Sequence, residues 1–182
     1  KLKIMGVEAV KSSTPAACRE KIKDALKIIM NEDSKVLNSF IQDFRKDFMN
    51  LKPEMVAYPR SVNGLNKWTE SHNLFKKGAP IHCKGAILYN YLIKDKGLHV
   101  KYPYIQEGDK IKFLHMKTPN TYQSTSISFM TKLPEELNLH NIIDYDTQFE
   151  KSFVEPLKFI TDIIHWRIDN SYGTQATLED FF

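Results

Sequence analysis

Residues 15–53 read PAACREKIKDALKIIMNEDSKVLNSFIQDFRKDFMNLKP, and they carry two successive amphipathic patterns. Apolar residues recur at helical spacing in the first pattern at Cys18, Ile22, Leu26 and Ile29. The second pattern has them at Leu37, Phe40, Ile41, Phe44 and Phe48 and ends before Pro53. Because only a short polar turn separates the two patterns, they predict an antiparallel helical hairpin. Thr14 is expected to cap the first helix, with Pro15 at its first position.

Downstream of the hairpin, the sequence favours a small sheet and further helices. Residues 55–58 are strand-like and stop at Pro59, and a polar loop follows over residues 60–80. Period-two alternation in residues 109–116 and 126–130 predicts two strands that can pair. Helical patterns return over residues 81–93 and from Asp144 onward, where Pro156 is expected to kink or restart the helix. The predicted fold class is therefore α+β and predominantly helical, with a helical hairpin, a small antiparallel β element and C-terminal helices.

Length and composition exclude several classes of protein. With 182 residues, 42% of them apolar, the chain can bury a core and is neither disordered nor fibrous. No apolar run approaches the ~20 residues that span a bilayer, and no signal peptide is present. The two cysteines, Cys18 and Cys83, are too few for a disulfide scaffold or a metal cage, which favours a reduced, intracellular chain. Because the first residue is not Met, we expect a piece of a longer protein.

The charge is distributed unevenly. Residues 1–101 carry 19 Lys and Arg against 10 Asp and Glu, whereas residues 102–182 carry 7 against 12. A polyanion would therefore meet the first half of the chain. Charge alone favours this interpretation no more than a basic surface that serves only solubility.

No catalytic constellation is recognisable in the sequence. It has no Gly-rich phosphate loop, no zinc-ligand spacing and no His-Glu-x-x-His motif, and its six histidines are scattered. Asp144 and Asp146 could share a divalent ion, but acidic residues in the first turn of a helix are the favoured interpretation.

The C-terminus holds the sharpest local signal. Residues 175–182 follow the pattern Gln-x-x-Leu-x-x-Phe-Phe, built from Gln175, Leu178, Phe181 and Phe182. One helical turn would gather the three apolar side chains on one face, which fits a hydrophobic groove, while the glutamine reaches a polar site. This pattern resembles the sliding-clamp-binding peptide of replication proteins. The alternative is that the aromatic residues fold back onto the domain.

Several blocks in order extend this resemblance to the whole chain. They are Lys3-Ile-Met-Gly-Val-Glu8 with Lys11-Ser-Ser-Thr-Pro15, Tyr58-Pro-Arg-Ser-Val-Asn-Gly64 with Asn66-Lys-Trp68, Pro80-Ile-His-Cys-Lys-Gly-Ala-Ile-Leu-Tyr-Asn90, Ile105-Gln-Glu-Gly-Asp-Lys-Ile111 and Phe149-Glu-Lys-Ser-Phe-Val-Glu-Pro-Leu157. Together they resemble the end of the palm and the thumb of family B DNA polymerases from T4-like bacteriophages. Each block is weak alone, but the ordered set is hard to obtain by chance.

The resemblance implies a domain organisation and a set of DNA contacts. Residues 1–10 would be the end of the palm, 11–172 the thumb domain, and 173–182 a flexible clamp-binding tail. Lys11 would reach the minor groove, where every base pair offers an acceptor, and Ser12 and Ser13 would donate to a phosphate. Further phosphate contacts would come from Arg60, Ser61, Asn63, Lys67, His82 and Lys84. The family often has Arg where this chain has Lys84 and Tyr where it has Trp68; for Trp68 and Tyr89, packing is favoured over stacking on bases.

The same resemblance implies a parent DNA-directed DNA polymerase, a nucleotidyltransferase acting in the cytoplasm of an infected bacterium. The palm carboxylates that hold Mg²⁺ resemble nothing in this sequence, so we expect no cofactor in this segment and no activity from it alone. Expected partners are primer–template duplex DNA and the sliding clamp, with no membrane and a monomeric segment. The alternatives are a non-enzymatic, clamp-tethered DNA-binding accessory protein and a protein-interaction domain with an incidental basic face.

Overall fold

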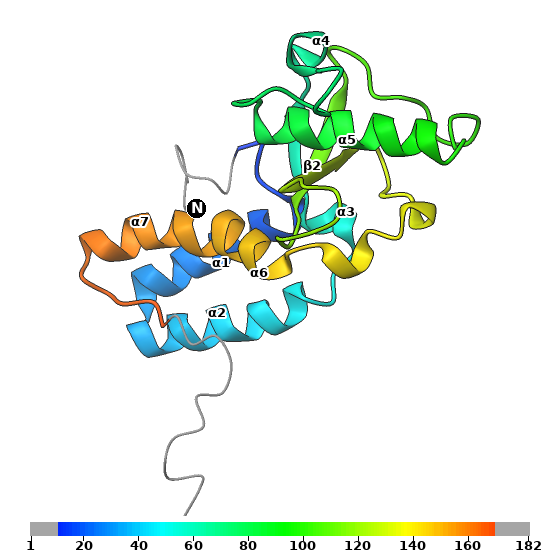
Figure 1. Cartoon of the computed structure of the whole chain (residues 1–182). Coiled ribbons are helices and arrows are strands. Elements are labelled where there is room, and N and C mark those ends of the chain that lie inside the picture. The colour runs from blue at the N-terminus through cyan, green and yellow to red at the C-terminus, as the bar shows by residue number, and fades with distance from the viewer. Residues whose placement is uncertain (1–10, 170–182) are drawn as a thin grey trace, which may run out of the picture.

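The computed structural model describes residues 11–169. The expected end of the palm, residues 1–10, and the expected tail, residues 173–182, lie outside this range. Figure 1 shows two adjoining parts: helices α1, α2, α6 and α7 form one, and α4, α5 and a sheet form the other, with α3 near their junction. A mainly helical α+β fold with a small antiparallel sheet is thus confirmed.

The predicted hairpin is formed by α1 (Ala16–Asn31) and α2 (Ser34–Phe48). Asp33 caps α2, because its side chain accepts hydrogen bonds from the backbone N–H groups of Lys35 and Val36 at 2.9 and 3.0 Å. The expected Thr14 cap of α1 is wrong. Pro15 occupies the N-cap position with extended backbone, and no side chain makes a cap hydrogen bond there.

An aromatic cluster joins the hairpin to the C-terminal helices. Phe44 and Phe48 of α2 meet Phe149 and Phe153, and the rings of Phe44 and Phe153 lie edge to face with centroids 4.7 Å apart. Such contacts add to the stabilisation that burial of the rings already gives. All four side chains are at least 97% buried, so this cluster is the centre of the helical part.

The C-terminal helix changes from α-helical to π-helical winding just before Pro156, the residue at which a kink or restart was expected. It runs as α6 (Tyr145–Phe149), a π-helical turn η4 (Glu150–Val154) and α7 (Glu155–Ile163). Pro156 stands in the first turn of α7 and has no backbone N–H to donate to the preceding turn. The chain stays helical from Tyr145 to Ile163, and the change of winding is the π-helical turn directly before this proline.

Three antiparallel strands in the order β1–β2–β3 form the sheet: β1 (Tyr58–Ser61), β2 (Lys110–His115) and β3 (Ser126–Phe129). The pairing of the last two strands confirms the expectation from their alternation. The strand expected at residues 55–58 is wrong: Pro53 starts a short helix, α3 (Pro53–Val56), and β1 begins at Tyr58 and includes Pro59. β1 is an edge strand, where a proline without an N–H group is tolerated.

Helix α5 (Ile81–Asp95) covers the sheet and lies unusually close to β3. The approach requires Gly85, since an added Cβ there would lie 2.7 Å from the backbone nitrogen of Ser128. Two serine hydroxyls of β3 also donate to the first turn of the helix: Ser126 to the carbonyl of Ile81 at 2.6 Å and Ser128 to that of His82 at 2.9 Å. These contacts fix the start of α5 on the sheet.

A buried amide makes several of the hydrogen bonds between the two parts. The side chain of Gln148 in α6 donates to the carbonyl of Val56 at 2.7 Å and accepts from the backbone N–H of His115 at 3.1 Å. Three shorter helices complete the described chain: α4 (Leu65–Trp68), η2 (Glu135–Leu137) and η3 (His140–Ile142).

Candidate nucleic-acid interface

Four of the predicted DNA contacts surround one open cavity of about 380 Å³. Ser12 and Ser13 come from the segment before α1, and Arg60 and Ser61 come from β1. Residues 47 positions or more apart meet here because the side chain of Arg60 donates from Nη1 to the carbonyl of Ser13 at 3.0 Å. Ser12 and Ser61 are exposed and Ser13 is half-buried, so hydroxyl groups are available to a ligand at the rim.

Lys110 adds a positive charge to this cavity. It is exposed at the start of β2, and its Cα is paired with that of Ser61 across the strands. The cavity therefore combines hydroxyl donors with two cationic side chains, Arg60 and Lys110. This chemistry suits an anion such as a backbone phosphate.

Arg60 lies between this cavity and a second one of about 450 Å³. The second cavity is lined by Thr14, Tyr58, Arg60, Phe113, His115, Lys151, Ser152, Glu155 and Pro156. The guanidinium carbon is 5.5 and 5.8 Å from the ring centroids of Tyr58 and Phe113, which are cross-strand partners stacked 5.1 Å apart. These cation–π contacts and the hydrogen bonds to the backbone hold Arg60 half-buried.

The turn that contains Asn63 is held by a carboxylate from a distant block. Gly64 has a φ of +82°, and the N–H groups of Gly64 and Leu65 both donate to the side chain of Glu107, the second at 2.7 Å. Asn63 is exposed, and its carbonyl accepts from the thiol of Cys83 at 3.5 Å. The turn therefore lies beside the first turn of α5, which carries two more of the predicted contacts.

Those two contacts, His82 and Lys84, are both half-buried. Burial lowers the pKa of the His82 imidazole below its usual value, and the positive charge of Arg60 lowers it further. At neutral pH His82 is thus an uncharged hydrogen-bonding group. Lys84 places its ammonium 5.7 Å from the ring centroid of Phe75.

The remaining predicted contacts are more dispersed. Lys67 is exposed on α4, with its ammonium 4.8 Å from the ring centroid of Trp68, and Lys11 is exposed where the described chain begins. Trp68 is half-buried against the core, and Tyr89 is 2% exposed with its hydroxyl donating to the carbonyl of Pro103 at 3.3 Å. Packing, the favoured role for both aromatic residues, is therefore what the structure supports.

Three residues of this region were not found from the sequence: Arg19, Glu107 and Lys110. Arg19 on α1 donates to the carbonyls of Ser12 and Thr14, each at 3.0 Å. The Gln-Glu-Gly-Asp block was a signal for Glu107, but its partner in the turn lies 43 residues away. The alternation of Lys110 and Lys112 predicted one charged side of a strand, but it did not show that Lys110 lies beside Ser12 and Ser13.

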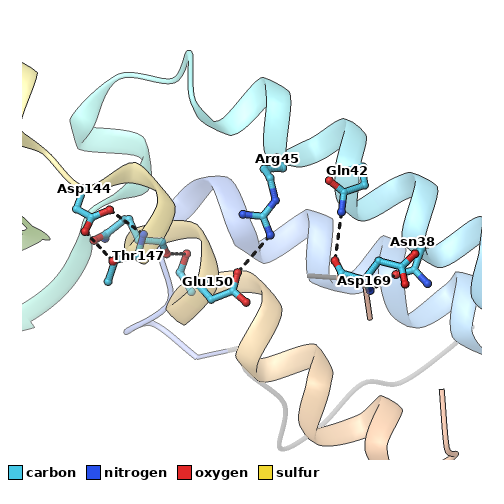
Figure 2. Close-up of polar contacts among 9 residues, drawn as sticks. Asn38, Gln42, Arg45, Asp144, Thr147, Glu150 and Asp169 are labelled. Atoms are coloured by element: carbon cyan, nitrogen blue, oxygen red, sulfur yellow. Dashed lines mark hydrogen bonds and ion pairs between the residues drawn. The ribbon is translucent and has the colours of Figure 1, made fainter. Parts of the chain in front are cut away.

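The end of the described chain returns along α2, as Figure 2 shows. The side-chain amide of Asn38 donates to the carbonyl of Arg167 and accepts from the N–H of Asp169, both at 3.0 Å. Gln42 donates to the carbonyl of Asp169 at 3.4 Å. The four predicted clamp contacts, Gln175, Leu178, Phe181 and Phe182, follow this anchored segment and lie outside the described residues.

Figure 2 also shows two acidic residues in structural roles. Asp144 caps α6 by accepting from the backbone N–H of Thr147 at 3.0 Å and from its hydroxyl at 2.7 Å, which confirms the helix-start interpretation. Glu150 pairs with Arg45 of α2 at 3.2 Å, and the guanidinium carbon lies 4.6 Å from the centroid of Phe149. Among residues 11–169, no three His, Cys, Asp or Glu side chains come together as a metal site would need. Over the same range, no helix combines the length and apolar character needed to cross a membrane.

The chain is similar to two curated phage proteins, each named DNA-directed DNA polymerase. The protein of Enterobacteria phage T4 is 29% identical over 160 residues, which is 86% of this chain. That of Escherichia phage RB69 is 30% identical over 187 aligned positions, which is the whole of this chain. The matched regions are 17% and 20% of those two proteins, so this chain spans about one fifth of their length. No protein-family model matches the chain. The resemblance to T4-like phage DNA polymerases is confirmed.

Proposed function

We propose that this chain is the thumb of a phage replicative DNA polymerase, the subdomain that grips primer–template duplex through its backbone and minor groove. One observation carries the proposal. In a chain similar along its length to two phage polymerases, Ser12, Ser13, Arg60 and Ser61 gather around one cavity with Lys110. The same similarity favours a polymerase segment over a non-enzymatic accessory protein.

The proposed grip uses contacts that do not read sequence. Lys11 enters the minor groove, where the N3 or O2 acceptor of every base pair can receive its hydrogen bond. Ser12, Ser13 and Ser61 donate to phosphate oxygens, and nearby cations release condensed counterions. His82 contributes a hydrogen bond and no charge, because its pKa is lowered. The domain therefore holds any duplex whose pairing geometry is correct.

Chemistry would lie outside this chain. Nucleotidyl transfer in a DNA polymerase uses Mg²⁺ held by carboxylates, which polarises the phosphoryl group and stabilises the leaving oxygen. We assign that role to a palm domain of the parent protein. The segment alone is expected to have no polymerase activity. The cytoplasm of an infected bacterium is the corresponding location.

The tail supplies the proposed link to a sliding clamp. Leu178, Phe181 and Phe182 would enter a hydrophobic groove while Gln175 binds a polar site on the clamp. Clamp binding then keeps the polymerase at high effective concentration on the same DNA. The anchoring of residues 167–169 on α2 gives this tail a fixed starting point on the domain.

The grip is tested by charge reversal. K67E/K84E should weaken binding of the chain to labelled duplex by on the order of tenfold or more, for all sequences alike, and flatten the log–log salt dependence by about 0.9 per lost phosphate contact. K35E/K46E on α2 makes the same change in net charge at positions outside the predicted DNA contacts and is the control. If K67E/K84E binds duplex as tightly as the control K35E/K46E does, the assignment of the interface is wrong.

The clamp link is tested by deleting residues 175–182 from the polymerase. Loss of clamp binding is expected, with clamp-free primer extension retained. If extension fails without the clamp, the tail is part of the fold instead. The sequence upstream of Lys1 separates the two candidate functions, since palm aspartate motifs there support a polymerase and a nearby start codon supports an accessory protein.

A further inference from the structure

Three consecutive backbone carbonyls before α1 are each bound by an arginine. Arg19 donates from Nη2 to Ser12 and from Nε to Thr14, and Arg60 donates from Nη1 to Ser13, all at 3.0 Å. The two arginines come from different elements, α1 and β1. The segment that carries the proposed minor-groove and phosphate contacts is thus held from two sides.

This arrangement changes what the segment presents to DNA. A carbonyl oxygen carries partial negative charge and repels a phosphate, and a guanidinium bonded to that oxygen offsets its charge. Holding residues 12–14 in one conformation also removes an ordering cost that binding would otherwise incur. Both effects favour an anion at the cavity rim where Ser12 and Ser13 lie.

The bonds of Arg60 are directed into the protein. Its Nη1 also donates to the carbonyl of Pro59 at 2.8 Å, and its guanidinium carbon lies within 5.8 Å of the ring centroids of both Tyr58 and Phe113. A group engaged in this way is poorly placed to move onto a phosphate. We infer that Arg19 and Arg60 are positioning residues, which act on DNA through the backbone of residues 12–14 and do not themselves bind phosphate. The inference rests on the proposed function.

Lysine cannot replace arginine in this role. Arg19 uses two nitrogens of one rigid, planar group to reach carbonyls two residues apart. A lysine ammonium keeps the charge but offers a single flexible donor atom. Exchange of arginine for lysine therefore removes the paired hydrogen bonds to the carbonyls of residues 12–14 while the positive charge stays.

The test measures binding of the full chain to labelled primer–template duplex as salt is raised. R19K and R60K should each weaken binding about tenfold while the log–log salt slope stays as in the unsubstituted chain. Loss of a direct phosphate contact would instead flatten the slope by about 0.9. K23Q, a charge change on the same helix as Arg19, should bind as the unsubstituted chain does.

A second readout separates positioning from general stability. Amide hydrogen exchange at residues 12–14 should be faster in both variants, while exchange in the core of α2 stays unchanged. Unweakened binding of R19K and R60K, a flattened salt slope, or unchanged exchange at residues 12–14 would overturn the inference. If the unsubstituted chain does not bind duplex at low salt, the proposed function itself is wrong.

Discussion

Replacing Gly85 with alanine tests how tightly α5 must lie on the sheet. The new Cβ would lie 2.5 Å from the hydroxyl of Ser128, 2.7 Å from its backbone nitrogen and 2.8 Å from the carbonyl carbon of Ile127. Ordinary contact begins near 3.4 Å, so helix and strand must separate by about 0.7 Å. Overpacking of this kind costs about 1–3 kcal/mol. Alanine regains about 0.5–1 kcal/mol of helix propensity, which leaves a net loss of about 1 kcal/mol at the middle of these two ranges.

Urea unfolding followed by circular dichroism measures this loss. We expect the midpoint to fall with the slope unchanged, because native packing is altered and the surface exposed on unfolding is not. S128G alone should destabilise the chain, because it removes the hydroxyl that bonds the carbonyl of His82. In the S128G background G85A should cost less than it does in the unsubstituted chain, but it should still destabilise, because both backbone clashes remain. Duplex binding should weaken as well, since His82 and Lys84 move with the start of α5. If G85A is as stable as the unsubstituted chain, the close approach is not a constraint and this reasoning fails.

Two further predictions concern the turn and the buried imidazoles. E107Q leaves one amide carbonyl oxygen as acceptor and places an NH2 donor against the other backbone N–H, so one of the two bonds from Gly64 and Leu65 is lost. Stability should fall by about 1 kcal/mol in thermal unfolding, whereas E135Q, at an exposed ion pair with Lys132, should change little. Burial lowers the pKa of both His82 and His115 in the folded chain, so the unfolded chain takes up protons first as pH falls below the ordinary value of 6.5. The free energy of unfolding should therefore be largest above pH 6.5 and decline as pH falls toward the lowered folded values. Urea unfolding at pH 7.5 and 5.5 checks this, and H82N/H115N should show a smaller difference between the two; equal stability of the unsubstituted chain at both values would contradict it.

Local patterns predicted most of the regular elements. The stripe from Leu37 to Phe48 identified α2 and its buried face, and the alternation near Lys110 identified β2, because helical and strand periodicities are properties of neighbouring residues. The errors occurred where a single proline decides between helix and strand. Pro53 starts a helical turn that runs into residues 55–58, which were expected to form a strand. Pro59 is tolerated within β1 because that strand lies at the edge of the sheet. Edge position depends on the whole topology and cannot be seen locally.

The sequence predicted several residues of the candidate site but not the contacts that hold them in place. The resemblance supplied Ser12, Ser13, Arg60 and Ser61, which the fold brings together. It did not supply Arg19, whose contribution is a pair of backbone contacts that leave no pattern in the sequence. Long-range hydrogen bonds to carbonyls depend on backbone geometry, and any residue type offers the same carbonyl. Such supporting residues therefore emerge only from a three-dimensional structure.

The pairing of Asn38 with the backbone of Arg167 and Asp169 has a geometric consequence for any protein that seats Gln175. Gln175 follows Asp169 by six residues, and an extended chain spans at most about 3.6 Å per residue. The distance from Asp169 to Gln175 is therefore at most about 22 Å. A protein bound at Gln175 through so short a linker would lie close to the α2 side of this domain and would have little freedom to tilt away from it.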